Sequence, residues 1–292
     1  MLPSHAWGQE QPRLNFPIFA GVENHIDFTL QADPALTLKR LAVPLYHFVK
    51  RRKTLRMMIN DYCHLAFGEP YRFKAIYLDR QGNQLLSSAM PGEFRAGGFF
   101  HCHIDHWLAE HGVPLVDGNL VLVASRGRAD RFLSSPGNVT LRIVTPTNIC
   151  GFRTGFFSRT LNAGQSHFGF TGLNPHVESN ARWLSSLLLI NHSSDPAYAQ
   201  RVTPTVRLYR SADEFLEAPF GEIAPHAALE KTIDELFPEA LTFLAGNHGR
   251  GHTITKLKGA TLASIHVMRT REGRLTSMEH SRPAHPNIID YL

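Results

Sequence analysis

The sequence predicts an all-β fold built as two tandem β-sandwich units with short helical turns. Three observations lead to this prediction. The apolar segments are short, rich in Val, Ile, Leu and Thr, and bounded by Gly, Pro, Asn, Asp or Ser, which is typical of strands. Long segments with the 3.6-residue period of a helix are missing. One order of segments also occurs twice along the chain.

The predicted strands follow one another along most of the chain, separated by turn residues. Their β-branched and apolar side chains suit a pleated surface that is buried on at least one face. The segments with the clearest pattern are residues 26–31, 54–60, 73–78, 120–125, 139–145, 186–191, 205–210, 253–257 and 261–267.

The internal repeat is clearest where residues 92–110 align without a gap on residues 221–239. Asp105 then matches Asp234, and further blocks keep the same order upstream and downstream. We expect each unit to contain two strands, an extended segment, a short helical turn and a closing strand. The two aspartates are expected near the start of the turn, where a carboxylate interacts with unpaired amides.

The repeat predicts the domain boundaries. Residues 1–145 are the first β-sandwich unit with an N-terminal extension, residues 146–180 are a linker packed between the units, and residues 181–292 are the second unit. Compared with the first unit, we expect the second unit to contain an insertion before its last strand, an inserted loop at residues 246–259. Function often lies where a loop departs from its scaffold.

Composition places the chain among globular proteins, with 43% hydrophobic and 19% charged residues. No apolar run reaches the ~18 residues that a membrane helix needs, and the N-terminus lacks the basic-then-apolar pattern of a secretory signal. We therefore expect no membrane span and a cytoplasmic location. The three cysteines are widely spaced and odd in number, so they do not predict a disulfide framework.

The net charge of +5 equals the excess supplied by one basic heptad, residues 50–56. A nucleic acid could bind such a patch. Because no aromatic residues are interleaved with the charges, the favoured interpretation is an exposed edge strand whose cationic side chains prevent it from pairing with another strand. The basic side chains are Lys50, Arg51, Arg52, Lys53 and Arg56.

Four segments of the second unit occur in a fixed order: a strand ending at Asn191, then residues 206–210, 223–237 and 264–274. In this order they resemble the sensory rhodopsin transducer family of small soluble β-sandwiches. The resemblance covers the repeated unit but not the linker. It implies a binding or adaptor module that forms homo-oligomers, and it implies no catalysis.

A second pattern, His101-Cys102-His103, resembles the HCHI segment of multicopper oxidases, since thiolate and imidazole suit copper. The third histidine of that segment would stand where this chain has Trp107, because His106 comes one residue early. Copper is therefore not predicted. A zinc site of His101, His103 and His106 with nearby His111 stays open, although surface histidines are the favoured interpretation in a chain with 17 of them.

Polar residues also gather in the sequence around the last strands of the second unit. Arginine offers a planar fork for carboxylate or phosphate, and histidine adds a donor or a metal ligand. We expect these side chains to line one pocket for an anionic ligand; the alternative is a set of solvated loop residues. The candidates are His248, Arg250, His252, His266, Arg269, His280, Arg282 and His285.

Two functions are consistent with these patterns. The first is a non-enzymatic tandem β-sandwich protein that binds an anionic small molecule, an acidic or phosphorylated glycan, or a protein partner through its second unit. The second is a metal-dependent enzyme in which histidines of residues 246–259 and of the C-terminal tail hold Zn or Fe. A purely structural assembly protein is a third interpretation. No nucleophile elbow or phosphate-binding loop is present, so binding without a cofactor is the prediction carried forward.

Overall fold

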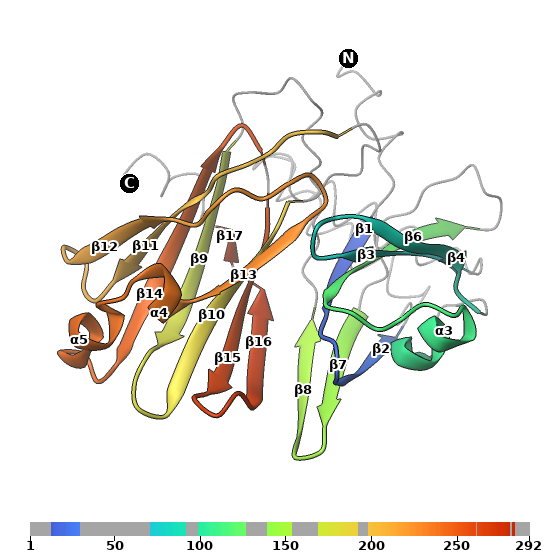
Figure 1. Ribbon diagram of the computed structural model, residues 1–292, viewed down its shortest axis with the longest axis horizontal. Coiled ribbons are helices and arrows are strands. Elements are labelled where there is room, and N and C mark those ends of the chain that lie inside the picture. Colours follow the sequence, from blue (N-terminus) through green and yellow to red (C-terminus); the bar gives the residue numbers. More distant parts are fainter. Residues whose placement is uncertain are drawn as a thin grey trace, which may run out of the picture.

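The computed structural model describes residues 13–29, 71–91, 99–126, 139–153, 169–191, 198–260, 262–280 and 282–283. Within these ranges the chain forms four antiparallel sheets with three short helices, as Figure 1 shows. The predicted all-β fold is confirmed.

Two of the sheets are formed by residues 13–153, in the strand orders β1-β6-β3-β4 and β5-β2-β7-β8. Side chains from both sheets, such as Phe16 and Tyr77 from one and Ile26 and Ile143 from the other, are buried in the same apolar cluster. The two sheets therefore form a β-sandwich. The strands are β1 (Arg13–Ile18), β2 (Glu23–Thr29), β3 (Tyr71–Asp79), β4 (Gln84–Ala89), β5 (Phe99–His103), β6 (Gly118–Arg126), β7 (Val139–Thr145) and β8 (Asn148–Arg153), and helix α3 spans Ile104–Glu110.

The other two sheets are formed by residues 169–283, in the orders β13-β10-β15-β16 and β12-β11-β14-β9-β17. Leu187 and Leu189 of β10 pack with Val206 and Leu208 of β11 in a second apolar cluster. The strands are β9 (Gly169–Glu178), β10 (Trp183–Ile190), β11 (Thr205–Tyr209), β12 (Phe215–Pro219), β13 (Ala228–Thr232), β14 (Arg250–Lys258), β15 (Ala263–Thr270), β16 (Leu275–His280) and β17 (Arg282–Pro283), with helices α4 (Ile233–Leu236) and α5 (Ala240–Ala245).

The strand orders of the two halves correspond, apart from the additional strand β17 of the second half. The order β4-β3-β6-β1 matches β12-β11-β14-β9, and β5-β2-β7-β8 matches β13-β10-β15-β16. In both halves a strand runs directly into a helix, at Ile104 and at Ile233, and an aspartate lies in the first turn of that helix, as predicted. The agreement supports a duplicated unit, and the division into two domains stays a prediction.

Strands occur in the segments predicted as an inserted loop and as a linker. Residues 253–257, predicted as a strand but also included in the inserted loop, belong to β14 (Arg250–Lys258), which lies between β11 and β9 in its sheet. β14 is the counterpart of β6, so it belongs to the shared pattern. Its β-branched centre, Thr253 to Thr255, is fully buried or nearly so, but the glycines that precede it gave the segment the composition of a loop. Residues 146–180, assigned to a linker, contain β8 and β9.

The two halves share an apolar and a polar contact. Ile265 and Met278 belong to the same buried cluster as Leu120 and Ile143. β8 lies beside β16 (Figure 1), and Asn148 Nδ2 donates a hydrogen bond of 2.8 Å to the carbonyl oxygen of Leu275. The four sheets therefore pack as one body across this boundary.

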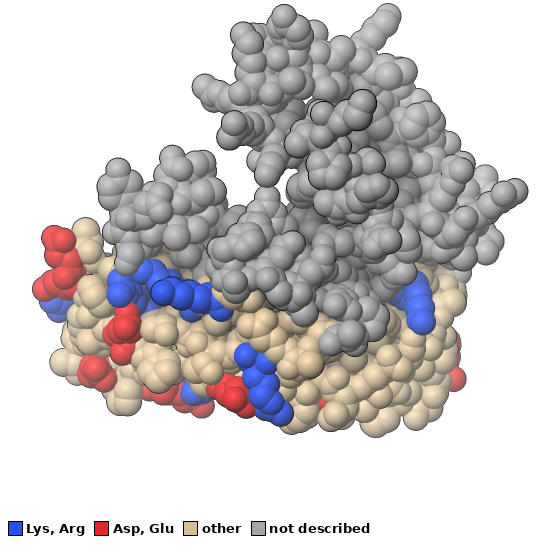
Figure 2. Space-filling view, turned by 90° about the horizontal axis from the view of Figure 1, so that it is seen from above, with Lys and Arg blue, Asp and Glu red and all other residues tan. Residues whose placement is uncertain are grey.

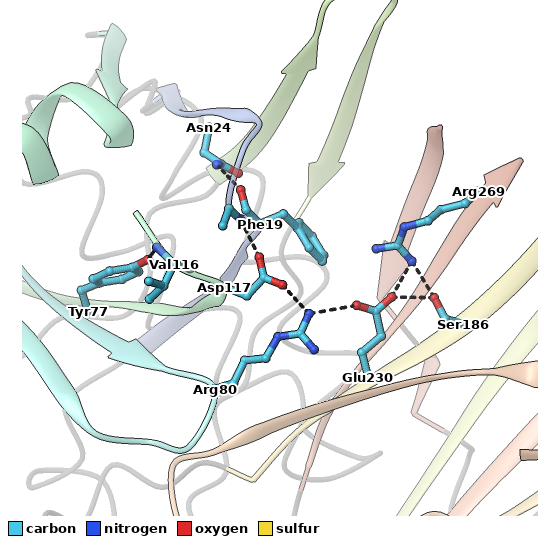
Figure 3. Close-up of polar contacts among 10 residues, drawn as sticks. Phe19, Asn24, Tyr77, Arg80, Val116, Asp117, Ser186, Glu230 and Arg269 are labelled. Atoms are coloured by element: carbon cyan, nitrogen blue, oxygen red, sulfur yellow. Dashed lines mark hydrogen bonds and ion pairs between the residues drawn. The ribbon is translucent and has the colours of Figure 1, made fainter. Parts of the chain in front are cut away.

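A charged network crosses the same boundary (Figure 3). Arg80 Nη2 lies 2.6 Å from Asp117 Oδ2 and 3.6 Å from Glu230 Oε2. Arg269 Nη1 donates to Glu230 Oε1 at 2.5 Å, and the Ser186 hydroxyl donates to the same oxygen at 2.6 Å. Glu230 thus holds two cations from different sheets.

Gly82 marks a close approach between the β3–β4 turn and residues 225–227. An added Cβ would stand 2.6 Å from the Pro225 carbonyl oxygen, whereas a Cβ on Gly273, which has the same φ of +88°, would meet nothing within 4 Å. We expect Gly273→Ala to destabilise by about 1 kcal/mol through its left-handed backbone and Gly82→Ala to cost about 1–3 kcal/mol more through overpacking. Urea unfolding of both variants measures the difference, and equal losses would contradict this contact.

Charged side chains are spread unevenly over the face shown in Figure 2. Lys and Arg are interspersed with Asp and Glu on the half formed by the later strands, and the half formed by β1–β8 is mostly uncharged there. The basic heptad at residues 50–56 lies outside the described residues. Among the described helices, none has the length and apolar character to cross a bilayer.

Candidate metal centre

Two neighbouring strands bring three histidines to one face of a sheet. β2 and β5 pair antiparallel, and His25 lies directly opposite His103. Because side chains alternate along a strand, Ile26 and Cys102 point into the buried core, and His25, His101 and His103 point to the opposite, outer face. A cross-strand pair therefore adds one histidine to the two on β5.

The nitrogen atoms of these three side chains lie close together. His25 Nδ1 is 3.0 Å from His101 Nε2, and the His103 ring centroid is 3.9 Å from that of His25 and 4.6 Å from that of His101. One ligand nitrogen from each residue falls within 4.8 Å of the other two. Imidazole nitrogens around a tetrahedral zinc ion stand about 3.4 Å apart, so small side-chain rotations would bring all three onto one ion.

We call His25, His101 and His103 the histidine cluster. Its three members differ in how far they are exposed to solvent. His25 is buried, His103 is half-buried and His101 is exposed. Burial lowers the pKa of His103 below its ordinary value, the neighbouring histidines, including His106, lower it further, and Glu23 acts in the opposite direction. A lowered pKa favours the neutral imidazole, which is the form that binds a metal.

Glu23, whose side chain is exposed, supplies a carboxylate beside the buried His25. Its Oε2 lies 3.6 Å from His25 Nε2, a buried nitrogen that makes no hydrogen bond within the described structure. If His25 Nδ1 bound a metal, its Nε2–H would face this carboxylate. Metal-binding histidines commonly donate their second N–H to such a group, which fixes the tautomer and raises the basicity of the ligand.

The structure places the other two histidines of the predicted zinc set outside the cluster. His106 of α3 stacks on His103 with ring centroids 5.0 Å apart, and it is not among the three donors that converge. His111 Nδ1 lies 2.8 Å from the Trp107 carbonyl oxygen, and its Nε2 lies 3.0 Å from the Ser88 hydroxyl. His106 therefore flanks the cluster, and His111 closes the end of α3.

His25 was missed by the sequence analysis because it stands 76 residues before His101. The alternation of β2 did contain a signal. Asn24 and Ile26 are buried on the core side of the strand, so the histidine between them, His25, belongs to the opposite face. Only the pairing of β2 with β5 brings that position to His103.

The residues predicted to line an anionic pocket are distributed over two sheets. His248, Arg250 and His252 lie at or just before the start of β14. Arg250 Nε is 3.4 Å from Glu178 Oε1. The His252 ring stacks on Tyr209 with centroids 4.8 Å apart and an interplanar angle of 4°.

The sheet that contains β15 and β16 carries three more of them. His266 is buried, with Nε2 2.8 Å from the Ser185 hydroxyl. Arg269 bonds to Glu230 in the charged network, and His280 ends β16. Arg282 belongs to β17, and His285 lies outside the described residues.

The described residues of this set are therefore divided between two sheets, and the single pocket stays a prediction. β14 belongs to one sheet, and β15 and β16 belong to the other. His266 and Arg269 already hold partners in the interior and at the boundary between the halves. These neighbours in sequence belong to different sheets because the chain passes from one sheet to the other between β14 and β15.

Comparison with known proteins identifies no family. No protein-family model and no curated protein matches the sequence. Two solved structures that align with the chain are glycosyl hydrolase family 2 members from Bacteroides cellulosilyticus. One has 11% identity and a TM-score of 0.18, covering 93% of this chain and 26% of that chain. The other, from strain DSM 14838, has 10% identity and a TM-score of 0.18, covering 93% of this chain and 28% of that chain. The chain thus spans about a quarter of the length of these proteins, and a likeness at this TM-score carries no conclusion about fold or function.

Proposed function

We propose that this β-sandwich protein binds a zinc-class divalent metal ion through His25, His101 and His103. The observation that carries the proposal is the convergence of three imidazole nitrogens within 4.8 Å on two paired strands. Imidazole suits Zn, Cu, Fe and Ni, and three histidines with one open position form a known zinc coordination set. The proposal keeps the metal alternative drawn from the sequence but places the site in the first half of the chain.

The local structure favours a pre-formed site. The three side chains come from strands whose inner faces are buried in the core, so the backbone under the cluster is held by packing. The Nδ1 of His25 and the Nε2 of His101 already face each other at 3.0 Å. An ion between these two nitrogens would replace their hydrogen bond, and each neutral ring would carry its proton on the nitrogen that faces away from the ion. Glu23 would then accept from His25 Nε2–H and orient the ring.

Titration of tag-free protein with ZnCl2, followed by calorimetry, tests this proposal. We expect one ion per chain and a loss of affinity of at least about 100-fold in His101→Ala or His103→Ala, since even an outer orienting residue typically costs 10- to 100-fold. For the same reason Glu23→Gln should weaken zinc binding by about 10- to 100-fold. His101→Ala is the most informative variant because His101 is exposed and its truncation leaves the core intact.

His248→Asn is the matched control for this titration. His248 is exposed and has a φ of +54°, which asparagine tolerates, so the variant removes a histidine without removing a ligand. Its zinc affinity should equal that of the wild type. Absence of binding, or the same affinity in all variants, would overturn the proposal.

A further inference from the structure

A divalent ion in the histidine cluster would keep its full charge, because all three protein ligands are neutral imidazoles. The cluster is open on the side of His101, which is exposed, and of His103, which is half-buried. A zinc ion with three protein ligands leaves at least one coordination position for another molecule. Both the charge and the open position favour an anionic oxygen as the remaining ligand.

A cation on the next strand lies on the same face. β7 pairs with β2 on the side away from β5, and Arg142 lies directly opposite His25. Its neighbours Leu141 and Ile143 are fully buried in the core, whereas Arg142 is exposed. Residues His103, His25 and Arg142 therefore form a row across three adjacent strands on the outer face.

The spacing of the row suits one small ligand. Side chains directly opposite each other on antiparallel strands have Cβ atoms about 4.5–5.5 Å apart. The arginine side chain is long enough to extend from its strand across His25 toward a metal held between His25 and β5. A guanidinium binds a carboxylate or phosphate with two parallel hydrogen bonds.

We infer that the metal-loaded site binds a small oxyanion, a carboxylate or a phosphate, with one oxygen on the metal and another held by Arg142. This inference rests on the metal site proposed above and names the class of its exogenous ligand. Binding is reversible coordination. The divalent ion supplies most of the attraction, and Arg142 selects ligands that carry a second anionic oxygen.

Visible absorption of the Co²⁺-loaded protein tests the inference, because cobalt bands report a change of ligand at the metal. Addition of inorganic phosphate or, in a second arm, acetate should shift the bands and saturate; the arm with the tighter binding gives the ligand class. Arg142→Gln should weaken anion binding by about 10-fold or more, as expected for loss of a charge-assisted hydrogen bond. The same variant should keep its Co²⁺ affinity within about 2-fold of the wild-type value, because this corresponds to about 0.4 kcal/mol, the spread of a surface substitution that does not touch the metal.

Arg201→Gln is the matched control, because Arg201 is also exposed and its ion pair with Glu222 is in the other half of the chain. Its anion binding should equal that of the wild type. If Co²⁺ binds but neither anion shifts its bands, or if Arg142→Gln binds anions as the wild type does, the oxyanion inference is wrong and the metal site stands. If Co²⁺ gives no histidine-dependent bands at all, the proposed metal site itself fails.

Discussion

Replacing Glu230 with alanine is expected to lower the free energy of unfolding by about 2–3 kcal/mol, less than the ~3–5 kcal/mol typical of removing one partner of a fully buried ion pair, because the Glu230–Arg269 pair is half-buried. The Glu230 side chain is 11% exposed and the Arg269 side chain 24% exposed. Alanine would leave Arg269 without its carboxylate, and it would also remove the acceptor of the Ser186 hydroxyl and the second partner of Arg80. Urea unfolding of the wild type and the variant measures the loss.

Glu222→Ala provides the matched control for Glu230→Ala. Glu222 also pairs with an arginine, Arg201, at 2.6 Å, but both side chains are more than half exposed. An exposed pair of this kind contributes about 0–1 kcal/mol. A loss in Glu230→Ala no larger than that in Glu222→Ala would contradict the role given to the network that joins the β3–β4 turn to β13 and β15.

A second large effect is expected on acidification, through His266. Burial lowers the pKa of His266 to about 4, with a smaller contribution from the charge of His176. The folded-state pKa is below the unfolded-state value of about 6.5, so the unfolded chain binds the proton first. The stability that depends on neutral His266 is present in full above pH 6.5 and is lost as the pH falls toward 4. At pH 4 the loss attributable to this residue is about 3 kcal/mol.

The comparison that isolates His266 uses His266→Gln, whose amide retains a polar atom near the Ser185 hydroxyl and does not titrate. Unfolding free energies of both proteins are measured between pH 7 and pH 4, since carboxylates contribute equally to both curves. The wild type should lose about 3 kcal/mol more than the variant over this range. Parallel curves would show that His266 takes up no proton on unfolding, contrary to its burial.

The fold class was predictable because strand patterns are local. Residues such as those of β10 and β15 combine β-branched and apolar side chains between turn residues, and that signal requires no knowledge of partners. The aspartates Asp105 and Asp234 were placed correctly in the first turn of a helix for the same reason. Residues 253–257 of β14 were predicted as a strand from the same local signal, but Gly249 and Gly251 also led to their inclusion in an inserted loop. The burial of β14 depends on its pairing with β9 and β11.

The candidate site was only partly predictable because it depends on strand pairing. The alternation of β5 was enough to place His101 and His103 on one face, but the third ligand was expected from the same segment, at His106. The register of β2 against β5 supplies His25 instead. Conversely, the histidines near β14 and β15 are neighbours in sequence but belong to different sheets, so the pocket expected from their number stays a prediction.

X-ray absorption at the zinc K-edge of the zinc-loaded, tag-free protein tests the metal site most directly. The account predicts nearest neighbours that are only nitrogen and oxygen, at about 2.0–2.1 Å, with the scattering of three imidazole rings and the loss of one ring in His101→Ala. A sulfur neighbour at about 2.3 Å, which would indicate Cys102 in place of a histidine, or a spectrum that His101→Ala leaves unchanged, would contradict it.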